Sequence, residues 1–395
     1  MNNNNNYMYL ISLLFFVVLS VFFVMNDQES NALGKGSGGI GPSLVVLCFL
    51  YSLVVFCSIR KKYSSTLVFF SLFYAWINIV NIITIDASYY VVLYRIAFYT
   101  IPIITLILCY SYARNEGLDR RLLIPVLVGF VVLTIQYFRI RFLSGENSLL
   151  FMGGDRLLCV NYPLFLVPLL LSFSNRKFLI VFVVVILFIT FSSGKRSTLI
   201  AVVIALLVYL LINSFYKNGM TVKSFLVFSV LLYALYYLIS FIDVINEGLL
   251  SERLLDITDD GGSGRDYVWE GTIRMIEKQD FTHSILGSGH DGVVRNSVYK
   301  LSAHNDFLEI RYDYGLIGVS LFIISLFSLL KKCSVYIYKR NNYASHLLSL
   351  IAMFGVLTMI SHVVYYYIMV MASISLGLLL GAADNEDFKK RIQLR

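Results

Sequence analysis

The amino-acid sequence predicts an all-α integral membrane protein with about twelve transmembrane helices and one long external loop that bears short helices. Hydrophobic residues make up 58% of the 395-residue chain, and only 14% of its residues are charged. Several apolar runs reach the roughly twenty residues that a helix needs to cross the hydrocarbon layer. Strands of a membrane barrel would alternate apolar and polar side chains, whereas residues 178–191 and 199–213 are apolar on every side.

Twelve apolar stretches are expected to span the membrane as helices. In chain order they cover residues 7–25, 44–59, 66–85, 90–112, 122–137, 157–173, 178–191, 198–215, 225–241, 307–330, 345–361 and 364–381. A mostly polar segment separates the ninth stretch from the tenth. The chain is therefore predicted to divide into nine transmembrane helices in 1–242, a long external loop in 243–306, and three further spans with a C-terminal tail in 307–395.

The distribution of Lys and Arg predicts the orientation, because positive residues near the ends of spans stay in the cytoplasm. One set of alternate loops carries eighteen cations, namely Arg60, Lys61, Lys62, Arg114, Arg120, Arg121, Arg176, Lys177, Lys217, Lys223, Lys331, Lys332, Lys339, Arg340, Lys389, Lys390, Arg391 and Arg395. The short loops of the other set carry six, namely Lys35, Arg139, Arg141, Arg156, Lys195 and Arg196. Both termini are therefore expected in the cytoplasm and the long loop outside. The net charge of +8 is mostly this signal, which argues against nucleic-acid binding.

The sequence indicates no cofactor, disulfide framework or metal site. The five cysteines lie within or beside apolar stretches, and none forms a paired spacing in the polar segment. Asp259 and Asp260 are adjacent carboxylates, but adjacent side chains point in different directions and no third ligand accompanies them. A metal ion is therefore not expected to take part.

The polar segment is predicted to contain a short helix that begins near Ser263. Ser263 can cap the helix, and Asp266, three residues later, can return the bond as a variant capping box. Trp269, Ile273 and Ile276 then fall at i, i+4 and i+7 on one helix face. That face is expected to lie against the membrane or against the other helices.

Arg265 falls in the first turn of this predicted helix, where the helix dipole disfavours a cation. A bound anion would relieve this conflict, and the glycine-rich residues up to Gly264 allow a phosphate to approach backbone N–H groups. Arg265 and Gly264 are therefore predicted to bind a phosphate. The alternative is a simple ion pair of Arg265 with Asp260 or Asp266.

Two adjacent cations, Lys195 and Arg196, occupy a short turn that is predicted to face outward between two apolar spans. Their position opposes the positive-inside preference, which favours a functional role. Arg196 and Arg265 are predicted to converge on one diphosphate, with Lys195 as a further binding residue. The alternative is that Lys195 and Arg196 extend toward lipid headgroups.

His304 is the candidate general base, because a neutral imidazole is well suited to remove a proton from a hydroxyl group near neutral pH. Asp306 or Glu309 is predicted to orient it, and Arg311 is a further predicted binding residue. The alternative for His304 is a hydrated residue that caps a helix. His290, in a glycine-rich turn, is a weaker candidate. No supporting constellation is evident in the sequence around the three other histidines, His283, His346 and His362.

Three short motifs in the last third of the chain form a signature. They are Gly-Arg-Asp-Tyr-Val-Trp at 264–269, His-Asn at 304–305 and, after nine intervening residues, Gly-Leu-Ile-Gly at 315–318. Together they resemble the outer-loop signature of the O-antigen polymerase and O-antigen ligase superfamily. The resemblance in architecture covers nearly the whole chain, whereas the residue-level motif covers only 196–318. Polymerases and ligases share the pattern, so it does not separate them.

The resemblance implies a metal-independent glycosyltransferase of the bacterial inner membrane with its active site on the outer, periplasmic side. Such enzymes take a glycan linked to undecaprenyl diphosphate and transfer its reducing end to an acceptor hydroxyl, usually with inversion. The resemblance assigns catalytic roles to Arg196, Arg265 and His304, and arginines can stabilise a diphosphate leaving group without a divalent ion. The implied partners are the lipid-linked oligosaccharide and the lipid bilayer, with a chain-length regulator and a flippase as further expected partners.

Within the superfamily the sequence favours the polymerase, which joins repeat units carried on polyprenyl diphosphate. The high Tyr and Phe content of the chain suits stacking against sugar rings, although aromatic belts at the membrane interfaces would also explain it. One alternative is the ligase, which hands a glycan to lipid A core. The second is a polytopic transporter or flippase, for which Arg95 and Pro102 in the fourth span are the supporting features.

Overall fold

The computed structural model describes residues 3–32, 40–58, 61–84, 89–143, 159–173, 183–190, 195–218, 261–298, 300–365 and 367–393. Every regular element in these ranges is a helix, which confirms the all-α prediction. The helices are α1 (Asn3–Ala32), α2 (Ile40–Ser58), α3 (Ser65–Ile83), α4 (Tyr89–Glu116), η1 (Arg120–Leu122), α5 (Leu123–Leu143), α6 (Asn161–Leu164), α7 (Val167–Phe173), α9 (Arg196–Asn218), α12 (Gly261–Glu277), α13 (Phe281–Leu286), α14 (Gly292–Asn296), α15 (Asp306–Asp313), α16 (Gly315–Tyr338), α17 (Ala344–Ile360) and α18 (Ile368–Gln393).

Eight helices in the described part of the chain are long and apolar enough to cross a membrane. They cover Tyr7–Asn26, Ile40–Ser58, Ser65–Ile83, Val91–Glu116, Arg120–Ile140, Ser197–Phe215, Gly315–Tyr338 and Ile368–Gln393. Two predicted spans, 157–173 and 345–361, correspond to shorter apolar helices, Asn161–Ser172 and Ala344–Ile360. The predicted span 225–241 and the segment 243–260 that follows lie outside the described residues, and of the predicted span 178–191 only 183–190 is described. The multi-pass architecture is therefore confirmed, and the number twelve stays a prediction.

The predicted span 307–330 is wrong at its start, because the structure breaks it into two helices. α15 ends at Asp313, and α16 begins at Gly315, whose φ of +68° lies in the left-handed region that glycine favours. A Cβ atom on Gly315 would lie 2.1 Å from the backbone oxygen of Ile285. Asp306 and Glu309 therefore belong to a short polar helix outside the apolar span.

Helix α18 lies at the centre of the bundle and packs closely against α4. In the most apolar stretch of α18, 94% of the residues are buried. Gly377 and Gly381 form a small-xxx-small pair, and a Cβ atom on them would come within 2.7 Å of the Leu106 oxygen and 2.4 Å of the Tyr110 oxygen. Small residues that let two backbones approach are the usual basis of helix packing in membranes. The helix α4 runs through Pro102 without interruption.

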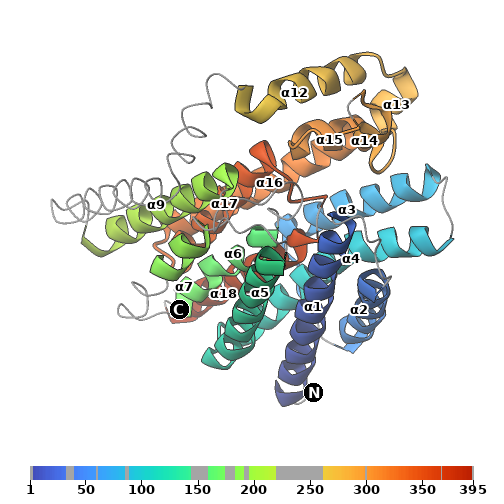
Figure 1. The fold of residues 1–395 in the computed structure, drawn as a ribbon. Coiled ribbons are helices and arrows are strands. Elements are labelled where there is room, and N and C mark those ends of the chain that lie inside the picture. The colour runs from blue at the N-terminus through green and yellow to red at the C-terminus, as the bar shows by residue number, and fades with distance from the viewer. Residues whose placement is uncertain are drawn as a thin grey trace.

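Four short helices, α12, α13, α14 and α15, lie together at one end of the bundle (Figure 1). The predicted helix in the polar segment is confirmed as α12, but it begins at Gly261, so Ser263 lies inside its first turn and is not the cap. The predicted apolar face is only partly correct, since Trp269 and Ile276 pack inward while Ile273 is 44% exposed. The buried residue on this face is Thr272, at the i+3 position from Trp269, and not Ile273.

Candidate functional site

The candidate site is built around His304, which stands immediately before α15. Its backbone has a φ of +50°, an uncommon left-handed conformation for a residue with a side chain. The preceding residue is held from two directions: the Ala303 N–H donates to Glu309 Oε1 at 2.7 Å, and Trp269 Nε1 donates to the Ala303 oxygen at 2.7 Å. The following residue, Asn305, caps α15 by accepting hydrogen bonds from two backbone N–H groups. The neighbouring contacts therefore fix the strained position of His304.

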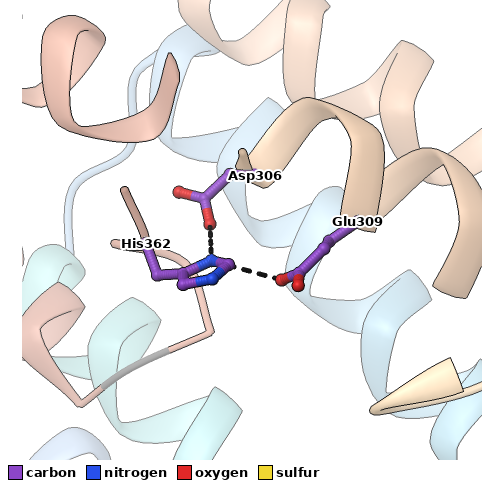
Figure 2. A group of neighbouring side chains, drawn as sticks. All are labelled: Asp306, Glu309 and His362. Atoms are coloured by element: carbon purple, nitrogen blue, oxygen red, sulfur yellow. Dashed lines mark hydrogen bonds and ion pairs between the residues drawn. The ribbon is translucent and has the colours of Figure 1, made fainter. Parts of the chain in front are cut away.

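A second imidazole, His362, lies fully buried between two carboxylates. Its Nδ1 atom is 3.4 Å from Asp306 Oδ1 and 3.2 Å from Glu309 Oε2 (Figure 2). Its Nε2 atom is 2.8 Å from Ser302 Oγ. His362, Asp306, Glu309 and Ser302 thus form one hydrogen-bonded group, here called the His362 cluster. It joins the turn between α17 and α18 to the segment that carries His304.

The two carboxylates of the His362 cluster also bind backbone N–H groups. Asp306 Oδ2 accepts from Val363 at 2.9 Å and from Val364 at 3.2 Å, so it holds the turn after α17 in place. Burial raises the pKa of Asp306 to about 8, and these two backbone bonds oppose the shift. The pKa of Glu309 is raised well above its usual range, chiefly by burial and then by Asp313 and Asp306. The His362 cluster therefore retains a carboxyl proton at neutral pH.

The structure brings three predicted site residues from distant segments close together. The ring of His304 lies 4.9 Å from the ring of His362. The pKa of His304 is lowered to about 3, chiefly by burial and next by the neighbouring His362, and the charges of Arg265 and Lys195 add to the shift. Lys195 Nζ also donates to Ser361 Oγ at 3.1 Å, beside His362. Lys195, Arg265 and His304 therefore share one electrostatic environment, in which the His304 imidazole is neutral near pH 7.

The other predicted site residues have different surroundings. Arg196 is the first residue of α9, directly after Lys195, and its side chain lies outside what the structure describes. Gly264 lies in the first turn of α12 and not in a loop, so Arg265 is the fifth residue of that helix. Arg311 donates to the Ser284 oxygen at 3.1 Å and to Ser284 Oγ at 2.8 Å, which braces α15 against α13.

His290 belongs to a polar group on the α4 side of the bundle. Its Nδ1 atom is 2.8 Å from the hydroxyl of Tyr99 in α4, and its Nε2 atom is 3.2 Å from Asp291 Oδ2. Burial lowers its pKa to about 4, although Asp291 opposes the shift. His290 therefore lies in a buried aromatic environment, stacked on Tyr365, whose ring centroid is 6.1 Å away and which also lies 6.2 Å from the ring of His362.

The structure differs from two expectations about the histidines. Asp306 and Glu309, predicted to orient His304, contact His362 in the structure. His362, for which the sequence suggested no constellation, has the most complete set of polar partners among the described histidines. The signal for it in the sequence was weak: a histidine at the junction of two apolar stretches, where ionisable residues are costly and tend to have a function.

Three groups of the His362 cluster have the donor types of a metal site. The ligand atoms of Asp306, Glu309 and His362 lie within 4.8 Å of one another. Their spacing would suit an ion held by two carboxylates and one imidazole. The same atoms are also satisfied by protons, because one oxygen of each carboxylate already accepts backbone hydrogen bonds and the other faces Nδ1 of His362. The geometry permits both arrangements.

The fold and the site define a polytopic membrane protein with a cationic and imidazole-containing centre at one end of its helix bundle. The family model described as O-antigen ligase matches residues 178–323. This match confirms the resemblance to the O-antigen polymerase and O-antigen ligase superfamily, and the matched segment includes Lys195, Arg196, Arg265 and His304. No curated protein matches the chain.

Proposed function

We propose that the protein is an O-antigen or related surface-polysaccharide polymerase that joins oligosaccharide repeat units carried on undecaprenyl diphosphate. The observations that carry this proposal are that Lys195 binds Ser361 beside His362, and that the charges of Lys195 and Arg265 act on the buried imidazole of His304. Cations suit a diphosphate, and a neutral imidazole suits an acceptor hydroxyl. The reaction takes place on the outer face of the bacterial inner membrane, with both chain termini in the cytoplasm.

In the proposed reaction, His304 removes the proton of the acceptor hydroxyl as the acceptor oxygen attacks the anomeric carbon of the donor. The bond between that carbon and the diphosphate oxygen breaks on the opposite face, so the configuration inverts. Arg265, Arg196 and Lys195 stabilise the negative charge that develops on the leaving diphosphate. The products are the extended glycan, undecaprenyl diphosphate and one proton, which His304 releases to solvent.

The low pKa of His304 gives donor binding a role in activating the base. Without a ligand the imidazole is a weak base, because burial and nearby cations oppose its protonation. A diphosphate bound between Arg265 and Lys195 would neutralise those cations and add negative charge beside the ring. The pKa of His304 then rises toward neutrality, where a general base works best. The donor therefore prepares the base for the acceptor.

In this proposal the His362 cluster positions the catalytic base and does not touch substrate. Glu309 accepts a hydrogen bond from the Ala303 N–H, and His362 is hydrogen-bonded to the Ser302 hydroxyl, so both residues before His304 are fixed. Because a displacement of about 1 Å can cost a hundredfold in rate, this fixation matters for catalysis. Protons are sufficient for this role, and the reaction is proposed to need no metal ion.

The ligase is the second candidate, since the matching family model carries that description. A ligase would use the same donor and the same base but would require lipid A core as acceptor. The two are separated with purified protein and a lipid-linked repeat unit alone: a polymerase produces a ladder of longer lipid-linked glycans, and a ligase produces none until lipid A core is added. Translocation without bond formation would instead support a transporter or flippase.

The base assignment is tested by His304→Ala, with His283→Ala as the matched control. His283 is an exposed histidine on α13 that pairs with Asp280 at the surface. His304→Ala is expected to lower the rate of chain extension at least a hundredfold, because general-base catalysis contributes about 10²- to 10⁴-fold. His283→Ala should extend chains at the normal rate. Equal activity of the two variants would remove His304 from the mechanism.

A further inference from the structure

A second cationic centre lies at the other end of the bundle, around a cavity of about 610 Å³. Its lining comes from the connection between α2 and α3, from the end of α4 and from the end of α18. The charged residues that line it are Lys61, Lys62, Arg114, Asp384, Asp387 and Arg391. This group is here called the basal cavity.

The basal cavity is separated from His304 by roughly the thickness of a membrane. Helix α16 begins at Gly315, close to the candidate site, and its Lys332 binds Asp384 at the basal cavity with an Nζ–Oδ2 distance of 2.5 Å. At about 1.5 Å per residue, the axial distance between these two points of α16 is roughly 26 Å. The charge distribution predicts that this end faces the cytoplasm.

The carboxylates of the basal cavity are satisfied by groups other than its lysines. Asp384 accepts from the hydroxyls of Tyr110 at 2.7 Å and Tyr336 at 2.5 Å, in addition to its ion pair with Lys332. Asp387 pairs with Lys339 at 2.7 Å and accepts from Asn341 at 3.0 Å. Neither carboxylate is therefore available to neutralise further cations in the cavity.

Three cations of the basal cavity have no ion-pair partner in the described part of the chain: Lys61, Lys62 and Arg391. Lys61 Nζ lies over the ring of Phe56, 4.3 Å from its centroid. Arg114 adds a fourth positive charge and stacks on Phe388 at 5.3 Å. The space enclosed by these side chains is therefore positively charged, and an anion would be attracted to it.

The size and the rim of the basal cavity indicate which anion fits. Phe388 and Tyr63 line it and are 53% and 56% exposed, which places aromatic rings beside the cations at the end of a span. Aromatic residues at this level face the interface between lipid headgroups and acyl chains. Basic pockets between spans on the cytoplasmic side are suited to anionic headgroups. An inorganic ion alone would leave most of the volume and the whole apolar rim without a contact.

We propose that the basal cavity binds the phosphate headgroup of an anionic phospholipid. Lys61 and Lys62 contact the phosphate as point charges, and Arg391 contacts two of its oxygens through the guanidinium group. Phe388 and Tyr63 contact the glycerol and the first part of the acyl chains. The bound lipid joins the α2–α3 connection to the end of α18 and so stabilises the bundle at this end.

The test uses the full-length protein in a neutral detergent and measures thermal stability against added phosphatidylglycerol, phosphatidylcholine or inorganic phosphate. The variant combines Lys61→Ala, Lys62→Ala and Arg391→Ala. The matched control removes three exposed cations of the same end that lie outside the cavity, with Arg120→Ala, Arg121→Ala and Lys331→Ala.

Phosphatidylglycerol is expected to stabilise the wild type and the control variant, at a half-saturating concentration at least tenfold lower than in the cavity variant. Phosphatidylcholine, which has no net charge, should have little effect on any of the three. The proposal is overturned if the cavity variant responds like the wild type. It is also overturned if inorganic phosphate stabilises the wild type as well as the lipid does, because the site would then recognise a free anion.

Discussion

Removing the imidazole of His362 tests the role of the His362 cluster. His362→Ala leaves two buried carboxylates facing each other without the group that lies 3.4 Å and 3.2 Å from their oxygens. Leaving a buried hydrogen-bonding group without its partner costs about 1–3 kcal/mol, because the group has lost water without gaining a replacement. Since 1 kcal/mol shifts the melting temperature of a large domain by about 2 °C, the expected loss is roughly 2–6 °C.

The assay is thermal unfolding of the purified protein in detergent, together with the rate of chain extension measured well below the melting temperature. The surface histidine variant His283→Ala is the control, since its pair with Asp280 is exposed and screened by water and therefore contributes little to stability. Adding Glu309→Gln to His362→Ala should recover part of the lost stability, because the amide places an N–H donor beside the Asp306 carboxyl group that lost the imidazole. If His362→Ala melts with the control and extends chains normally, the His362 cluster neither stabilises the site nor positions His304.

Three further predictions concern the base, the packing and the diphosphate. When the donor binds near pH 6, the protein should take up a proton, since the lowered pKa of His304 rises when an anion lies beside it. Calorimetry in buffers of different ionisation enthalpy should show this uptake in the wild type and none in His304→Gln. Gly381→Val should destabilise the protein by about 1–3 kcal/mol, because its new side chain would meet the backbone of α4. Gly355→Val is the control, since a Cβ atom there meets nothing within 4 Å. Similar melting temperatures of the two variants would refute this packing. Arg265→Lys should lower the rate of chain extension at least tenfold, because Lys cannot make a bidentate phosphate contact. The control Arg274→Lys changes an exposed arginine and should leave the rate unchanged. Full activity of Arg265→Lys would exclude a bidentate contact.

Much of the fold follows from hydropathy, because each transmembrane helix is set by a local run of apolar residues. Eight of the predicted spans reappear as candidate spans, although their ends shift by several residues. The break at Gly315 was harder to predict, since it depends on the approach of the Ile285 backbone from another element. The cap at Ser263 was misplaced for a related reason: glycine-rich residues indicate a loop by local preference, and the structure continues the helix through them.

The candidate site was only partly predictable from sequence. Arg265 and His304 stand in short motifs, and local chemistry was enough to select them. His362 lies far from Asp306 and Glu309 along the chain, and only the folding of α17 back onto α15 brings it to their carboxylates. A contact of this kind leaves no periodic or spacing signal. The same carboxylates were therefore assigned to the nearer histidine, His304.

The most direct test of the central claim measures bond transfer and diphosphate release together. Purified protein is incubated with an undecaprenyl-diphosphate-linked repeat unit in the presence of a strong chelator. The proposed mechanism predicts that each new glycosidic bond releases one molecule of undecaprenyl diphosphate, that the chelator has no effect, and that Arg265→Ala abolishes both products. Intact donor without released diphosphate, or a reaction that stops on chelation and resumes with a divalent metal, would contradict it.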